Sequence, residues 1–291
     1  VVIGGDLRGS TDRITQAVIH AVKEAGYSVE YLDHVPTPLL SYYAFTRGLA
    51  HVMVTGSHIP DDRNGIKFVK THEELMKEDE KDVLSAVTEV REKTYGKLAS
   101  ESPFDENGIL KLRQTAPDRL VLPIVNDGAG EEYLQRYTRV FPGKPLKGKK
   151  IVVYEQSTVG WDLLVNVLEQ LGAEVIREGR SAAFIPIDTE NITPENLAYF
   201  KKLAEKHKPD AIVSGDGDFD RPLVIDAQGR FYRGDVLGLV VAKALNVDFA
   251  AVPISANDIV RDELKKAGIE MRQTKIGSPY VARAMQGAEA R

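Results

Sequence analysis

Short apolar runs of strand length alternate with longer amphipathic segments along nearly the whole of this chain. Residues 1–5 and 150–154 have the composition of buried strands, and residues 12–25 and 194–206 have helical periodicity. The second helical segment follows Thr193, a capping residue, and begins with proline, which is favoured at the first helical position. Strands that alternate with helices pack as α/β layers with largely parallel sheets. We therefore expect an α/β protein.

The length of the chain and the restarts of this pattern predict its division into domains. A chain of 291 residues normally forms two or three domains. The strand–helix pattern restarts twice, and we expect domains over residues 1–126, 127–227 and 228–291, the third of them incomplete. The chain opens on a strand-like run without methionine and stops where no element has closed. We expect further sequence at both ends.

Composition and charge exclude several classes of function. The chain has no cysteine, which excludes disulfides, thiolate chemistry and cysteine-ligated zinc. The net charge of −5 gives no electrostatic reason to expect a nucleic acid partner. Neither a signal peptide nor an apolar run of membrane-spanning length is present in the sequence. We therefore expect a cytoplasmic enzyme with no membrane partner.

Three aspartates stand at alternate positions directly after an apolar strand. Asp216, Asp218 and Asp220 follow the run 211–214, so they lie at the carboxyl end of a strand, where α/β sheets bind ligands. An acidic surface turn and an aspartyl phosphatase are the alternatives. An EF-hand loop needs glycine at its sixth position and glutamate at its twelfth, where this chain has Arg221 and Ala227. A Mg²⁺ site with one open coordination position fits best, because Mg²⁺ takes few carboxylates plus phosphoryl oxygens.

A serine stands at the end of another predicted strand, in Thr55-Gly56-Ser57-His58-Ile59-Pro60. Its hydroxyl is a candidate nucleophile or phosphoryl carrier, and a plain turn is the alternative. A catalytic triad is disfavoured, because adjacent residues rarely place a serine and its histidine base in line and no Gly-x-Ser-x-Gly motif occurs. Lys67 follows closely and is a candidate to point back toward this loop.

A third loop, Gly5-Asp6-Leu7-Arg8, joins the first predicted strand to the first helix. Backbone amides at a helix N-terminus, together with an arginine, can bind a phosphate group. The loop lacks the Gly-Lys-Ser/Thr ending of a P-loop and the third glycine of the dinucleotide fingerprint. By itself this loop is a weak signal for phosphate binding.

Taken together, these motifs resemble those of the α-D-phosphohexomutase superfamily, in its phosphomannomutase/phosphoglucomutase branch. The order and approximate spacing of the Arg8 loop, the Ser57 loop, Asn64-Gly65-Ile66-Lys67 and the aspartate run all match, over essentially the whole chain. The resemblance implies tandem three-layer α/β/α domains, with mixed and largely parallel sheets, arranged around a central cleft. A fourth, phosphate-binding domain would be absent from this chain.

The resemblance also implies roles for individual residues. Ser57 is similar to the phosphoserine that gives and recovers the phosphoryl group. The Mg²⁺ ligands would be Asp216, Asp218, Asp220 and an oxygen of phosphorylated Ser57. Catalytic residues around the phosphoserine would be Arg8, His58 and Lys67, and substrate-binding residues would be Arg221, Lys275, Gly277 and Ser278.

The chain departs from the family pattern at Ile59, where asparagine is usual after the Ser-His pair. The implied reaction interconverts hexose 1-phosphate and hexose 6-phosphate of mannose or glucose. It would proceed through a hexose 1,6-bisphosphate, which also serves as the priming activator. A phosphoglucosamine mutase and a non-catalytic fragment that keeps only the metal site are the alternatives. The expected partner is a small phosphosugar, and the expected state is a monomer or homodimer.

Overall fold

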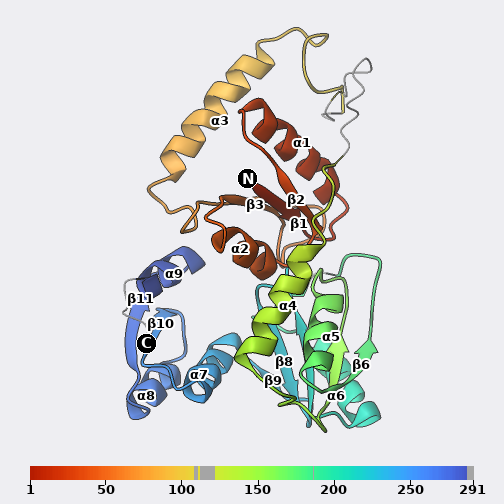
Figure 1. Cartoon of the computed structure of the whole chain (residues 1–291), viewed down its shortest axis with the longest axis vertical. Coiled ribbons are helices and arrows are strands. Elements are labelled where there is room, and N and C mark those ends of the chain that lie inside the picture. Colours follow the sequence, from red (N-terminus) through yellow and green to blue (C-terminus); the bar gives the residue numbers. More distant parts are fainter. Residues whose placement is uncertain (108–110, 112–121, 186, 287–291) are drawn as a thin grey trace.

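The computed structural model describes residues 1–107, 111, 122–185 and 187–286. Figure 1 shows three units along the chain, each with its own sheet. The sheets have four, five and two strands, and helices flank each of them. The predicted α/β fold with mixed, largely parallel sheets is confirmed.

The first sheet has the strand order β2-β1-β3-β4. Strands β1 (Val2–Gly5), β2 (Glu30–His34) and β3 (His51–Val54) are parallel, and β4 (Ile66–Val69) returns antiparallel to β3. Helix α1 (Thr11–Glu24) packs on one face and α2 (Thr37–Phe45) on the other. Successive strand residues face opposite sides, so Val2 packs with α2 and Ile3 packs with α1.

Helix α3 (Glu80–Tyr95) begins only after a turn that follows β4. Before this helix, Glu74 pairs with Val69 in an isolated bridge. The carboxylate of Asp79 accepts hydrogen bonds from the Met76 backbone N–H (2.7 Å) and from Lys70 (2.8 Å). These bonds hold a turn before the helix and delay its start.

The second sheet repeats the order of the first, as β6-β5-β7-β8-β9. Strands β5 (Lys150–Tyr154), β6 (Glu174–Glu178) and β7 (Ala211–Gly215) are parallel. Strands β8 (Pro222–Asp226) and β9 (Phe231–Tyr232) complete it antiparallel, and α5 (Trp161–Gln170) and α6 (Pro194–His207) flank it. The sheet thus extends past residue 227, while the domain boundaries themselves stay a prediction.

Helix α4 (Gly128–Val140) joins the first two units (Figure 1). Its Ala129 and Tyr133 belong to the apolar core around Leu40 of α2, and its Leu134 packs with Val167 of α5. One helix therefore contributes to the cores of both units. This shared packing fixes the carboxyl edge of the first sheet relative to that of the second.

The third unit has the parallel strands β10 (Phe249–Pro253) and β11 (Glu270–Thr274). It also contains α7 (Gly234–Ala244), α8 (Asp258–Lys266) and α9 (Ser278–Gln286). Arg283 of α9 forms ion pairs with Glu73 (3.1 Å) and Glu78 (2.7 Å), so this unit contacts the first. None of the helices in the described part of the chain has the length and hydropathy needed to cross a membrane.

Candidate functional site

Two equivalent loops of the first and second sheets meet at the candidate site. The β3–β4 loop carries Ser57 and the β7–β8 loop carries the three aspartates, and each joins a parallel strand to its antiparallel neighbour. The Oγ of Ser57 donates a hydrogen bond of 2.5 Å to Oδ2 of Asp216, which lies 159 residues away. Ser57 (φ 51°) and Phe219 (φ 61°) have left-handed backbone conformations, which non-glycine residues rarely adopt. The structure therefore brings the two predicted loops into direct contact.

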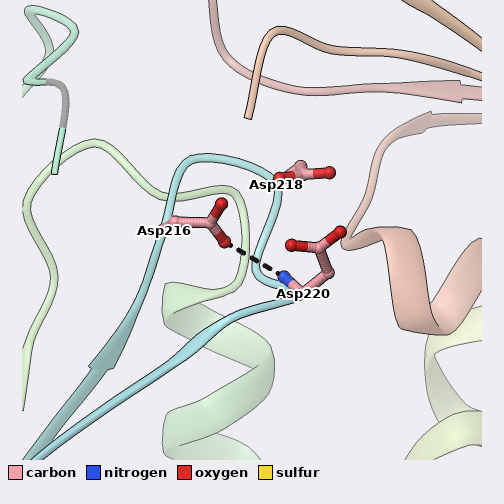
Figure 2. Close-up of side chains that lie close together, drawn as sticks. All are labelled: Asp216, Asp218 and Asp220. Atoms are coloured by element: carbon pink, nitrogen blue, oxygen red, sulfur yellow. Dashed lines mark hydrogen bonds between the residues drawn. The ribbon is translucent and has the colours of Figure 1, made fainter. Parts of the chain in front are cut away.

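The three aspartates form a compact carboxylate cluster, drawn in Figure 2. One oxygen from each residue lies within 4.8 Å of the others, and Asp216 and Asp218 are fully buried. Oδ1 of Asp216 accepts hydrogen bonds from the backbone N–H groups of Asp220 and Arg221, both 3.2 Å. Oδ1 of Asp218 is buried and has no hydrogen-bond partner among the residues that the structure describes. A set of hard carboxylate oxygens with one buried oxygen left unpaired fits a Mg²⁺ ion.

Lys67 supplies the positive charge closest to this cluster. Its Nζ contacts Oδ2 of Asp218 at 2.8 Å and Oδ2 of Asp220 at 3.1 Å. Burial disfavours the charged amine, but the two carboxylates outweigh it and raise the pKa of Lys67 above its ordinary value. Lys67 therefore lies at the site as a cation, where the sequence placed it.

The two buried aspartates differ in their ionisation because their neighbours differ. Burial and the charges of Asp218 and Asp220 raise the pKa of Asp216 to about 7. Burial acts in the same direction on Asp218, but Lys67 and the hydrogen bonds from Lys67 and Thr37 hold its pKa below the ordinary value. Without a cation, the surroundings thus favour the charged form of Asp218 and disfavour the charged form of Asp216.

The backbone of the Ser57 loop surrounds the guanidinium group of Arg8. All five guanidinium N–H donors have acceptors, and its Nε pairs with Oδ2 of the fully buried Asp6 at 3.1 Å. The other four bonds, of 2.6 to 2.9 Å, go to the carbonyl oxygens of Ser57, Ile59, Pro60 and Arg63. No donor is left for a phosphoryl group in this arrangement. These bonds hold the backbone of the Ser57 loop, and the catalytic role of Arg8 stays a prediction.

The faces of the Arg8 guanidinium are also covered. A Cβ added to Gly56 would lie 2.6 Å from Cζ of Arg8, so glycine is required for this close approach. The ring of Phe184, from the second unit, lies over the guanidinium with its centroid 4.2 Å from Cζ. Sequence reasoning missed Phe184 and Asp6. The position of Asp6 between two predicted phosphate-loop residues is the one signal that could have revealed it.

His58 lies beside Ser57, and its Nδ1 is buried without a hydrogen-bond partner among the described residues.

The sequence also missed Thr37, whose hydroxyl donates to Oδ2 of Asp218 at 2.7 Å. Thr37 is the first residue of α2, and nothing in the local sequence reveals a partner 181 residues away.

The four predicted substrate-binding residues lie in two places. Arg221 lies beside the cluster, with its Nε 4.0 Å from Oδ1 of Asp220 and its Nη1 3.2 Å from Oε1 of Glu190. It also lines a cavity of about 430 Å³ that extends to the third unit. Lys275, Gly277 and Ser278 lie on the turn between β11 and α9 instead. Oγ of Ser278 donates to Glu74 at 2.9 Å, and no described contact joins this turn to the cluster.

Fold and site together define an α/β protein in which a serine loop of one domain faces a carboxylate loop of the next. The family models for phosphoglucomutase/phosphomannomutase α/β/α domain I and domain II match residues 1–94 and 131–229, together more than half of the chain. The chain belongs to this family, the α-D-phosphohexomutases.

The relatives in this family include two curated proteins and a solved structure. The chain is 37% identical to a phosphomannomutase of Sinorhizobium fredii over 291 residues, all of this chain and 57% of that protein. It is 36% identical to a phosphomannomutase of Salmonella muenchen over 98% of this chain and 54% of that protein. A phosphoglucomutase/phosphomannomutase family protein from Burkholderia thailandensis has the same fold, with a TM-score of 0.77 at 19% identity, covering 99% of this chain and 60% of that one. The chain spans little more than half the length of these relatives.

Proposed function

We propose that this protein carries the phosphoryl-transfer half-site of a phosphohexomutase, with Ser57 as the phosphoryl carrier. The observation that supports this most is the hydrogen bond from Oγ of Ser57 to the buried Asp216, which forms one carboxylate cluster with Asp218 and Asp220. A serine whose hydroxyl lies against a carboxylate-rich cation site is suited to carry a phosphoryl group, because that cation balances the phosphoryl charge. The phosphomannomutase relatives support mannose or glucose phosphates as substrates.

The proposed reaction has two matched phosphoryl transfers. In the first, a hydroxyl oxygen of the hexose monophosphate bonds to phosphorus as the bond from phosphorus to Oγ of Ser57 breaks. The hydroxyl proton leaves to a base, for which we propose His58, and a hexose 1,6-bisphosphate results. In the second, Oγ of Ser57 takes the other phosphate and the base returns its proton to the sugar oxygen. The products are the isomeric monophosphate and phosphorylated Ser57, so no phosphate is consumed after priming by a bisphosphate.

Each residue of the site has a defined part in this proposal. Asp216, Asp218 and Asp220 would hold Mg²⁺, which when bound stabilises the negative charge of the transferring phosphoryl group. Lys67 adds a second positive charge beside the same oxygens, and Arg8 fixes the loop that carries Ser57. Arg221 and the turn of Lys275, Gly277 and Ser278 would contact the sugar phosphate. For that turn, the proposal requires the third unit to move relative to the cluster.

Phosphorylation of Ser57 is the direct test. We expect the intact mass of the chain to rise by one phosphoryl group on incubation with glucose 1,6-bisphosphate and Mg²⁺, with the modification on Ser57. Ser57→Ala should abolish the gain, and Ser100→Ala, at an exposed serine outside the site, should not. A wild-type chain that gains no phosphoryl group under these conditions contradicts the carrier role.

Turnover assays identify the substrate. The chain and its full-length form should be compared on mannose, glucose and glucosamine phosphates, since glucosamine preference would indicate a phosphoglucosamine mutase. A chain that gains the phosphoryl group but does not turn over would be a catalytically incomplete part of the enzyme. The cytoplasmic location, the three-domain division and the monomeric or homodimeric state stay predictions.

A further inference from the structure

Thr37 connects the first domain to the metal loop of the second. It is the first residue of α2, and its hydroxyl donates to Oδ2 of Asp218 at 2.7 Å. Its backbone N–H donates to the carbonyl oxygen of Asp218 at 2.9 Å. The first N–H groups of a helix have no partners within the helix, and the positive end of the helix dipole favours nearby negative charge. The start of α2 therefore stabilises both the backbone and the carboxylate of Asp218.

The two oxygens of Asp218 have different surroundings. Oδ2 accepts hydrogen bonds from Thr37 and from Lys67, whose Nζ lies 2.8 Å away. Oδ1 is buried and has no partner in the described part of the chain, and the residue has no exposed surface. Rotation of this carboxylate would break both of these hydrogen bonds. The direction of Oδ1 is thus fixed by donors from the other domain.

We propose that Thr37 is a positioning residue of the metal site, which holds Oδ2 of Asp218 so that Oδ1 is directed at the cation. Groups that orient metal ligands commonly change metal affinity 10- to 100-fold when they are removed. Because Thr37 and Lys67 come from the first domain and Asp218 from the second, cation binding and domain docking stabilise each other. The inference rests on the proposed function only for the presence of a divalent cation in this cluster.

A purely structural role for Thr37 makes a different prediction. If its hydroxyl only fastens the two domains together, removing it lowers stability and leaves the affinity of the folded protein for the cation unchanged. If it positions Asp218, removing it weakens cation binding even under conditions in which the variant stays folded. Metal affinity measured without sugar therefore separates the two roles.

The experiment is a calorimetric titration of the chain with Mn²⁺ alone. Thr37→Val keeps the shape and the backbone N–H and removes the hydroxyl, whereas Thr37→Ser keeps a hydroxyl donor. Thr46→Val is the matched control, since the Thr46 hydroxyl donates to the carbonyl oxygen of Tyr43 at the opposite end of α2. We expect the Kd for Mn²⁺ to rise about 10-fold or more in Thr37→Val, with Thr37→Ser and Thr46→Val close to wild type.

Hydrogen exchange provides a second readout that does not depend on any variant. Mn²⁺ should slow exchange in the wild-type chain both at residues 216–221 and at the start of α2. Wild-type affinity in Thr37→Val, or protection confined to 216–221, overturns the inference. A wild-type chain that binds Mn²⁺ with this dependence on Thr37, but takes no phosphoryl group at Ser57, supports the inference and overturns the proposed function.

Discussion

Replacement of Arg8 by methionine separates loop positioning from catalysis. Methionine has a comparable length and removes the charge and all five donors. Arg8 is 2% exposed and its partner Asp6 is fully buried, so the change leaves a buried carboxylate without its cation. Thr11 and Thr55 still donate to that carboxylate, both at 2.7 Å, so it stays hydrogen-bonded but loses its charge partner.

The magnitude follows from these contacts. Removal of one member of a buried ion pair costs about 3–5 kcal/mol. The loss of the stacking on Phe184 adds about 0.5–2 kcal/mol, and the four loop carbonyls lose donors but can be rehydrated in part. We expect Arg8→Met to lower the free energy of unfolding by about 4–7 kcal/mol, a large fraction of the roughly 5–15 kcal/mol of a typical domain.

Urea denaturation followed by circular dichroism measures the loss, and hydrogen exchange locates it. Exchange should accelerate most in the loop from Gly56 to Asn64, since Arg8 contacts its backbone four times. Arg261→Met is the control, because Arg261 is half-exposed and forms a helical surface pair with Asp258 at 3.3 Å. Such surface pairs contribute about 0–1 kcal/mol.

The two roles of Arg8 predict opposite results. If Arg8 positions the loop, Arg8→Met changes the free energy of unfolding, the hydrogen exchange of the loop and the phosphorylation of Ser57 together. A residue that only stabilises transferring charge changes phosphorylation of Ser57 and leaves stability and loop exchange as in wild type. The latter result would refute the assignment made from the geometry and restore the catalytic role predicted from the sequence.

Two further perturbations test the surroundings of the site. Gly217→Ala would place a Cβ 2.7 Å from the carbonyl oxygen of Ser57. Because overpacking of this kind costs about 1–3 kcal/mol, we expect calorimetry to show an affinity for Mn²⁺ reduced about tenfold. Unchanged affinity would contradict the close approach of the two loops. Burial lowers the pKa of His51 to about 4 from the ordinary 6.5. Below pH 6.5, His51 therefore binds a proton in the unfolded chain but stays neutral in the folded chain until the pH approaches 4. The contribution of His51 should therefore lower the free energy of unfolding by about 2 kcal/mol between pH 7.5 and pH 5. In urea titrations at these pH values, His51→Gln should reduce this dependence of stability on pH. An equal pH dependence in the variant and the wild type would rule out His51 as its source.

The sequence predicted well those parts of the molecule whose information is local. The strand before Ser57 and the strand before Asp216 are apolar runs that end in polar loops, and both are β-strands in the structure. The chemistry of the aspartate loop could be predicted, because three aspartates at alternate positions have few purely structural uses. Each of these loops follows the carboxyl end of a strand in its own sheet, which is where α/β sheets bind ligands.

The parts that the sequence did not reveal depend on contacts between distant segments. Thr37 and Phe184 have no distinctive local pattern, and each acts on a residue that lies more than 170 positions away. Arg8 carries the right charge for a phosphate site, and only its geometry shows that every donor is already used. Residue type and spacing predict which groups can bind phosphate, but not which of them are already occupied by the protein itself.

Three carboxylates lie within 4.8 Å of one another, two of them buried, and donors from the neighbouring domain compensate for their charge. Within its own loop, Asp216 accepts two backbone N–H bonds, and Asp218 has no side-chain donor from the second sheet among the described contacts. The hydroxyl of Ser57, the amine of Lys67 and the start of α2 all come from the first domain. Separation of the domains would leave the cluster to repel itself or to take up protons. The same contact between the two domains therefore brings the carboxylate cluster and the serine loop together.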